Sequence, residues 1–155
     1  MADVYQNFLP ANHFADIEQL FMTNALPWFF NDRVVSTEKH FMFSHVFMED
    51  GQVMNPRFFG PVNAMLQPMQ QKLPFIGVSR IRAVLYTNQG REIQHPTHLD
   101  IPEESGLSDK FRIAVFHVNT CNGKTVIGDQ EIESVANQLV IFENVPHYGT
   151  VQTDT

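Results

Sequence analysis

Two histidines and an aspartate lie close together in the segment 91–105, which reads REIQHPTHLDIPEES. In a strand, residues two apart in the chain point to the same face, so His98 and Asp100 present an imidazole and a carboxylate side by side. His95 lies three residues before His98 and faces the other way in an unbroken strand, although Pro96 can bend such a strand. Imidazole and carboxylate are common ligands of divalent transition metals. The segment therefore predicts two ligands of a metal site, with His95 outside the set.

The third ligand must come from another part of the chain, and His147 is the best placed of the seven histidines. It lies in the segment NVPHYGT, after the apolar run QLVIF, where a strand end meets a turn. Two histidines and one carboxylate on one face of a metal form the facial triad of non-haem Fe(II) oxygenases, which leaves positions open for substrate and O2. A short H-x-D pattern also occurs at surfaces and turns, so the spacing alone leaves both interpretations open.

The bulk composition excludes several classes of protein. The chain has 155 residues, 43% of them hydrophobic, which fits one globular domain. Its net charge of −7 argues against broad binding to nucleic acid or anionic membranes, since both need a basic face. Cys121 is the single cysteine, so no internal disulfide forms and a reducing, cytoplasmic location is expected. We find no secretory signal and no apolar run of about 18 residues that would span a membrane.

The first 77 residues are expected to be helical and mixed. A helix is predicted within residues 10–24, with Asn12 as its N-cap. Its apolar face carries Phe14, Ile17, Leu20 and Phe21. A second helix is predicted over residues 59–74, with Pro61 in its first turn and Pro68 producing a kink.

The rest of the chain is dominated by strand patterns. Strands are expected at residues 39–48, 78–87, 92–100, 111–120, 124–128, 131–135 and 138–144. The pair Asn122-Gly123 predicts a tight hairpin, because both residues tolerate positive φ, and residues 128–131 (GDQE) predict another turn. Short strands separated by turns indicate an antiparallel sandwich or barrel. The predicted class is α+β, mainly β, with the metal-type residues in the β part.

Several segments resemble one family of enzymes. The segments RIRAVLY, HLD, FHVNTCNGKT, ESVANQLVIFEN and PHYGT resemble the 2-oxoglutarate- and Fe(II)-dependent oxygenases, in particular the prolyl-4-hydroxylase-like branch with its compact phage and bacterial members. The segments NFLP and LPWFFND are similar to parts of the same compact members. The resemblance covers most of the chain, and the order H-x-D, N-x-x-N-G-x-T, H is more specific than H-x-D alone.

This resemblance implies a fold and an iron site. It implies a single oxygenase domain over residues 1–155, in which residues 1–77 pack helices on a double-stranded β-helix (jelly-roll) core formed by residues 78–155. Fe(II) is then held by His98, Asp100 and His147. 2-Oxoglutarate chelates the iron, O2 is the second cosubstrate, and the family allows for ascorbate as a reductant.

The resemblance also implies residues that contact the cosubstrate or the substrate. Tyr86 matches a tyrosine that reaches 2-oxoglutarate in related enzymes. His117 stands where those enzymes usually carry a tyrosine, a departure that leaves its role open, and Thr125 matches a position that lines the pocket. Arg82 shares a strand face with Tyr86 and is expected to approach the substrate. His95 is expected either at the rim of the site or in contact with a metal ligand, the rim being favoured.

In the family, the far carboxylate of 2-oxoglutarate pairs with an arginine on the strand after the distal histidine. Burying that carboxylate unpaired would be costly, and the planar guanidinium binds it bidentately. The printed sequence ends at Thr155, before that position and before the last strand of the β-helix. We expect that the sequence is a fragment. The alternative is a protein that has lost its cosubstrate site, in which case substitutes are sought among Arg80, Arg82, Arg91 and Arg112.

The predicted function is hydroxylation of an unactivated C–H bond, coupled to decarboxylation of 2-oxoglutarate to succinate. The substrate is expected to be a prolyl or other side chain of a protein or peptide, or a small molecule. Two alternatives stay open: a non-catalytic β-helix binding module, and a metal-binding cupin-like protein that does not use 2-oxoglutarate. The expected location is the cytoplasm of a bacterium or of a phage-infected host. The sequence does not predict the oligomeric state.

Overall fold

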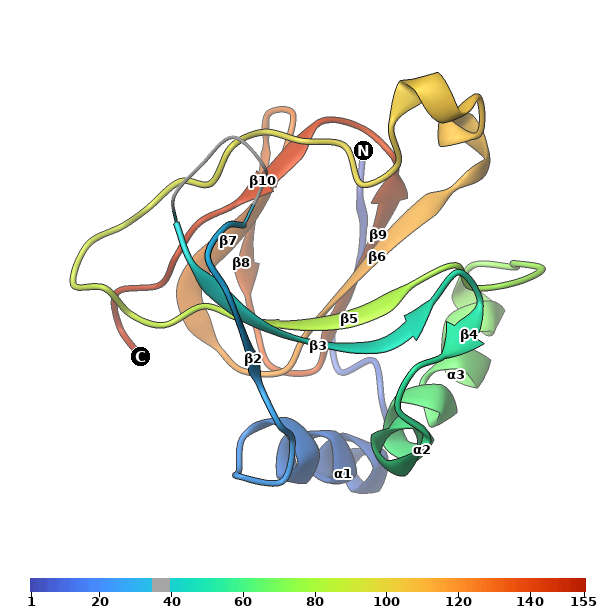
Figure 1. The fold of residues 1–155 in the computed structure, drawn as a ribbon, viewed down its shortest axis with the longest axis horizontal. Helices are drawn as coiled ribbons and strands as arrows, with labels where there is room; N and C mark the ends of the chain where they lie inside the picture. The colour runs from blue at the N-terminus through green and yellow to red at the C-terminus, as the bar shows by residue number, and fades with distance from the viewer. Residues whose placement is uncertain (35–39) are drawn as a thin grey trace. The chain divides into compact units, whose positions relative to one another are not determined.

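The structure, a computed structural model, describes residues 1–34 and 40–155 (Figure 1). The chain forms two compact units, each assembled from separate stretches. Unit 1 contains Met1–Phe8, Asp32–Phe41 and Tyr86–Thr155, and unit 2 contains Leu9–Asn31 and Met42–Leu85. No helix in the described part of the chain is long and apolar enough to cross a membrane.

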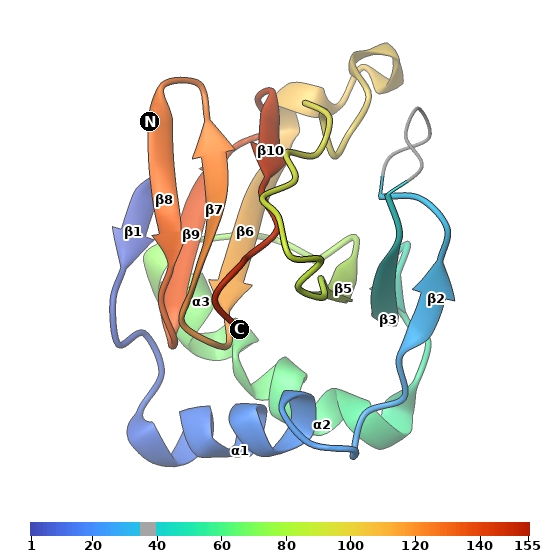
Figure 2. The same ribbon diagram turned by 90° about the vertical axis from the view of Figure 1, so that its left-hand side faces the viewer.

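Unit 1 consists of two antiparallel three-stranded sheets (Figure 2). One sheet has the order β1-β9-β6 and the other has the order β10-β7-β8. Their bounds are β1 (Asp3–Tyr5), β6 (Arg112–His117), β7 (Cys121–Ile127), β8 (Gln130–Ser134), β9 (Gln138–Glu143) and β10 (His147–Gly149). Two short 3-10 helices, η1 (Glu103–Ser105) and η2 (Ser108–Lys110), lie in the loop before β6.

The core of unit 1 lies between its two sheets. Val140 and Phe142 of β9 form one cluster with Ile127 of β7 and Ile132 of β8. The first five residues of β9 are all buried, so this strand is covered on both faces. A strand buried on both faces carries an unbroken apolar run, which explains why the sequence QLVIF identifies it so clearly. His147 follows this strand and begins β10.

Unit 2 contains the helices and the remaining sheet. Its elements are α1 (Ala11–Phe21), β2 (Phe29–Asn31), β3 (Met42–Glu49), β4 (Gln52–Val53), α2 (Pro56–Ala64), α3 (Leu66–Lys72) and β5 (Ile81–Leu85). The strand β3 pairs antiparallel with β2, β4 and β5. Leu20, Leu26, Phe47 and Val62 form the buried cluster of this unit. Lys39, the first residue of the predicted strand 39–48, lies outside the described residues.

The helices differ from the sequence prediction in where they begin and break. α1 begins directly after Pro10, so Asn12 lies inside the helix and is not its N-cap. The predicted helix 59–74 is two helices, since α2 begins at Pro56 and α3 follows from Leu66. Pro68 has no N–H to donate to a carbonyl one turn earlier, so the chain breaks just before it, and Pro68 falls in the first turn of α3, where no such bond is needed.

The hairpin predicted at Asn122-Gly123 is wrong, because both residues lie inside β7. The register of β7 against β8 shifts between Cys121 and Lys124, which marks a β-bulge. A Cβ on Gly123 would lie 3.1 Å from the backbone oxygen of Thr150. This glycine is therefore needed for close approach of two backbones and not for a turn. The predicted turn at residues 128–131 is confirmed, since Gly128 has φ +57° between β7 and β8.

Candidate metal centre

The three residues predicted as metal ligands lie together in unit 1. One possible ligand atom from each of His98, Asp100 and His147 lies within 4.8 Å of the other two. His98 and His147 form a bridge in which each backbone N–H donates to the other residue's carbonyl, at 3.0 and 3.1 Å. Asp100, two residues after His98, contributes the carboxylate of this group. Two chain segments about 50 residues apart are thus locked together at the site by their own backbones.

Hydrogen bonds hold both histidines in the same tautomer. The Nδ1–H of His98 donates to the backbone oxygen of Pro96 at 3.1 Å, and the Nδ1–H of His147 donates to that of Val145 at 2.9 Å. A carbonyl oxygen only accepts, so the proton lies on Nδ1 and the lone pair of Nε2 is available to a metal. Metal-binding histidines are commonly oriented by such a bond from the second ring nitrogen. The donor set of two imidazole nitrogens and one carboxylate fits Fe(II) of the facial-triad type.

His147 and Asp100 form a pair in the metal-free chain. Nε2 of His147 lies 3.5 Å from Oδ2 of Asp100, and the imidazole is buried. Burial opposes the charged imidazolium, but the hydrogen bonds to Asp100 and to the Val145 carbonyl, with the charge of Asp100, outweigh it and raise the pKa of His147. When His147 is protonated, its Nε2–H faces the Asp100 carboxylate, in the position that a metal would take. A metal competes with this proton, so metal binding becomes stronger as the pH rises through the raised pKa of His147.

Asn144 is a residue of this site that the sequence did not single out. Its side chain accepts from the N–H of Ile101 at 3.2 Å, and donates to the Ile101 carbonyl at 2.8 Å and to Oγ of Ser108 at 2.7 Å. It thereby ties the segment after Asp100 to the segment before His147. A buried amide at the end of the apolar run QLVIFE is the signal that could have identified it, because a buried amide needs partners.

The side chain of His95 lies on the same side of the chain as that of His98, which corrects the parity argument. Gln94 pairs with Thr150, and His98 pairs with His147. The two pairs are therefore four residues apart on one segment and only three residues apart on the other. The extra residue is a β-bulge, and it reverses the alternation of side chains between Gln94 and His98. His95 is only 2% exposed, so it is an interior residue and not part of a rim.

The residues predicted to contact the cosubstrate lie in different surroundings. His117 donates from Nδ1 to Oε1 of Gln138 at 2.6 Å, and its Nε2 lies 3.4 Å from Oγ1 of Thr125, the second predicted cosubstrate residue. Burial lowers the pKa of His117, although the bond to Gln138 opposes this. Tyr86 is half-buried in unit 1 and packs its ring against His95. Arg82 is exposed on β5 of unit 2, and its predicted approach to the substrate stays a prediction.

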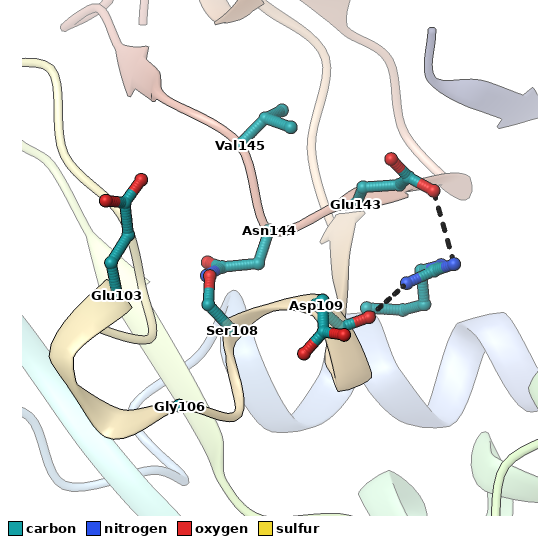
Figure 3. A pocket seen from close by; sticks show the side chains of 8 residues that line it. Glu103, Gly106, Ser108, Asp109, Glu143, Asn144 and Val145 are labelled. Carbon is teal, nitrogen blue, oxygen red and sulfur yellow. Dashed lines mark hydrogen bonds and ion pairs between the residues drawn. The ribbon is translucent and has the colours of Figure 1, made fainter.

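A separate pocket of about 480 Å³ lies beside the loop that follows Asp100 (Figure 3). Its walls carry three acidic side chains, those of Glu103, Asp109 and Glu143. Arg112 pairs with Glu143 at 3.2 Å, so the one basic group of the lining is already paired. Asn144 also lines this pocket and faces Ser108, which connects the pocket wall to the segment that leads to His147.

Three solved structures resemble this one over nearly all of its length. An oxidoreductase of the 2OG-Fe(II) oxygenase family from Burkholderia pseudomallei matches with a TM-score of 0.68 and 14% identity, over 98% of this chain and 78% of that one. A prolyl-4-hydroxylase from Pseudomonas putida matches with a TM-score of 0.54 and 16% identity, over 97% and 84%. A prolyl hydroxylase from Trichoplax adhaerens, in complex with a peptide fragment of hypoxia inducible factor, matches with a TM-score of 0.60 and 13% identity, over 97% and 76%.

The chain has the double-stranded β-helix fold of the 2-oxoglutarate oxygenases. No protein-family model matches the sequence, and no curated protein matches it either. At these identities the likeness shows the fold, which confirms the predicted class of a mainly β protein with a jelly-roll core.

Proposed function

We propose that this protein is an Fe(II)- and 2-oxoglutarate-dependent dioxygenase that hydroxylates an unactivated C–H bond. The observation that carries the proposal is the cluster of His98, Asp100 and His147, in which both imidazoles donate from Nδ1 to a backbone carbonyl and so offer Nε2 to a metal. The fold of the solved oxygenases supports the same reaction class. The iron, when bound, supplies the activation of O2 that is coupled to decarboxylation of 2-oxoglutarate to succinate, with ascorbate as a reductant.

The chain's own residues hold the metal and keep coordination positions open. His98, Asp100 and His147 occupy one face, and the backbone bridge between the two histidines fixes that face before the metal binds. Asn144 keeps the segment after Asp100 in place. A ligand set that is already arranged avoids the cost of ordering it when the metal binds.

We propose that Tyr86, His117 and Thr125 form the binding site for 2-oxoglutarate. In the geometry found here, His117 has its only N–H on Gln138, so it orients the hydroxyl of Thr125 and does not itself donate to a carboxylate. Arg82 is proposed as a substrate contact. The Trichoplax adhaerens enzyme binds a peptide, which supports a prolyl or other protein side chain as the substrate class, with a small molecule as the alternative.

The test is an anaerobic titration of the purified chain with Fe(II) and 2-oxoglutarate. The chelate of 2-oxoglutarate with the bound iron gives a visible charge-transfer band, which we expect in the wild type and not in His98→Ala. His13→Ala is the matched control, because His13 lies in unit 2 and bonds to the Pro61 carbonyl. The absence of a band from the folded wild type, or an equal band in His98→Ala, contradicts the proposal. Admission of O2 should then give succinate in the wild type and in His13→Ala, and not in His98→Ala.

A further inference from the structure

Asn122-Gly123 is the one Asn-Gly pair of the sequence, and it does not form the turn that its composition favours. An asparagine followed by glycine is also a reactive setting for loss of the side-chain amide, because glycine has no side chain that hinders attack by its own backbone nitrogen. Asn122 is exposed, and the register of β7 against β8 gives neither residue a partner on β8. The pair therefore combines a reactive sequence with an irregular part of the strand.

Segment 150–154 holds Asn122 in place, beside the start of β7 (Figure 2). The backbone N–H of Asn122 donates to the two carboxylate oxygens of Asp154, at 3.1 and 3.0 Å. The side-chain oxygen of Asn122 accepts from the N–H of Thr153 at 2.8 Å, and its side-chain nitrogen donates to Oγ1 of Thr153 at 2.8 Å. Both polar atoms of the side chain are thus bound by one residue of the segment.

The same segment covers Gly123. This glycine is buried, and a Cβ on it would lie 3.1 Å from the backbone oxygen of Thr150 and 3.5 Å from the backbone nitrogen of Gln152. The segment is itself anchored, since the side chain of Gln152 donates to the Tyr86 carbonyl at 2.6 Å. A bond between the Asn122 side chain and the Gly123 nitrogen needs the peptide between them to turn, and this close packing leaves no room for that. The segment must therefore move away before the two groups can react.

We propose that Asn122 is a site of spontaneous deamidation, which segment 150–154 holds back in the folded chain and which releases this segment once it has occurred. The backbone nitrogen of Gly123 attacks Cγ of Asn122, so that a C–N bond forms and the side-chain nitrogen leaves as ammonia, with the proton that Gly123 loses. Water then opens the cyclic imide at either carbonyl, which gives aspartate or its isomer with the backbone running through the side chain. The inference is independent of the proposed function.

Both products weaken the contacts that hold the segment. The new carboxylate at position 122 lies beside that of Asp154, and like charges repel each other. It also has no N–H to donate to Oγ1 of Thr153. The isomer in addition lengthens the backbone of β7 at a point where Gly123 packs closely against Thr150. Because the amide is not restored, the segment stays released after the reaction.

The experiment follows deamidation of Asn122 by peptide mass spectrometry, in chain kept folded in mildly alkaline buffer and in chain unfolded in guanidinium chloride. We expect slow reaction in the folded wild type and fast reaction in the unfolded chain. Asp154→Ala removes the acceptor of the backbone N–H, and Thr153→Val removes the acceptor of the side-chain N–H. Each folded variant should react about 5- to 30-fold faster than the wild type, since losing one or two hydrogen bonds raises the population of the opened segment by about this factor. Both replaced side chains are exposed, so the variants should fold.

Thr23→Ala is the matched control, because it also removes hydrogen bonds but lies in unit 2. The hydroxyl of Thr23 donates to the Gln19 carbonyl at 2.7 Å and accepts from the N–H of Ala25 at 3.2 Å. This variant should leave the rate at Asn122 unchanged. Asn122→Asp carries the charge of the product from the start, so the backbone N–H of Val151, which donates to the Ile93 carbonyl, should exchange with solvent faster in it than in the wild type.

Faster deamidation in the two segment variants alone, together with faster exchange of Val151 in Asn122→Asp, supports the inference. Equal rates in the folded wild type, Asp154→Ala and Thr153→Val would overturn the protective role of the segment. An equal acceleration in Thr23→Ala would overturn it as well, because the reaction would then proceed through global unfolding. An unfolded chain that keeps its amide at Asn122 would refute the site itself, and unchanged exchange of Val151 in Asn122→Asp would refute the release of the segment.

Discussion

Replacing Asn144 by alanine should weaken the metal site and the fold together. The side chain makes three hydrogen bonds, two to the backbone of Ile101 and one to Ser108, and all three are lost in Asn144→Ala. At about 1 kcal/mol for each bond, the free energy of unfolding should fall by about 3 kcal/mol. Asp100 directly precedes Ile101, so its carboxylate loses its fixed position. Removing a residue that orients a metal ligand typically lowers metal affinity by about 10- to 100-fold.

Two measurements separate these effects. Urea unfolding of the metal-free chain gives the change in stability, and an anaerobic Fe(II) titration at low temperature, where the variant is folded, gives the change in affinity. Ser108→Ala is the graded control, because it removes one of the three bonds and leaves both bonds to Ile101 in place. It should cost about 1 kcal/mol of stability and little metal affinity. An Asn144→Ala protein that is destabilised but binds Fe(II) as tightly as the wild type would refute the positioning role.

Three further predictions follow from the pKa shifts and from one close contact. The pKa of His147 is raised above 6.5 in the folded chain, so its pair with Asp100 stabilises the metal-free protein below pH 6.5, and this stabilisation is lost as the pH rises through the raised pKa. Urea unfolding of the wild type and of Asp100→Asn should therefore give free energies of unfolding that differ more at about pH 5.5 than at about pH 8.5. His95 has its pKa lowered from 6.5 to about 4, so stability should fall as the pH drops through that window, by up to about 3 kcal/mol, and pH-dependent unfolding of His95→Phe should lack this fall. Gly123→Ala places a Cβ 3.1 Å from a backbone oxygen of the segment after His147, so it should lower the free energy of unfolding by about 1–3 kcal/mol in a urea titration. In Gly149→Ala the nearest contact of the added Cβ is 3.7 Å, so this variant should change the free energy of unfolding less.

Local periodicity predicts the grouping of the candidate ligands better than it predicts the position of their neighbour His95. His98 and Asp100 are two residues apart, so only a short regular stretch is needed to place them on one face, and His147 follows the most apolar strand of the chain. His95 is separated from them by Pro96 and by a bulge, which depends on the register against a segment about 50 residues away. The alternation of side chains along an unbroken strand does not contain information on this register, so the prediction from it placed His95 on the wrong face.

The elements that the sequence missed depend on distant contacts. The strand β1 has three residues, too few for a visible pattern, and exists because it pairs with β9 at the far end of the chain. The pair Asn122-Gly123 has the composition of a hairpin. In the folded chain the backbone N–H of Asn122 donates to the carboxylate of Asp154 at 3.0 Å, and its side chain donates to Thr153. Tertiary pairing with the last residues thus overrides the local turn preference.

The tautomers of His98 and His147, and the atom through which each binds a metal, test the central claim most directly. Chains labelled with 15N-histidine are measured by NMR without metal and with Zn(II) as a diamagnetic substitute, and the two signals are assigned with His98→Gln and His147→Gln. At a pH above the raised pKa of His147, both rings should carry the proton on Nδ1, and Zn(II) should shift both Nε2 resonances while Nδ1 stays protonated. A proton on Nε2 in either ring, or Nε2 resonances that Zn(II) does not shift, would contradict the account of this site.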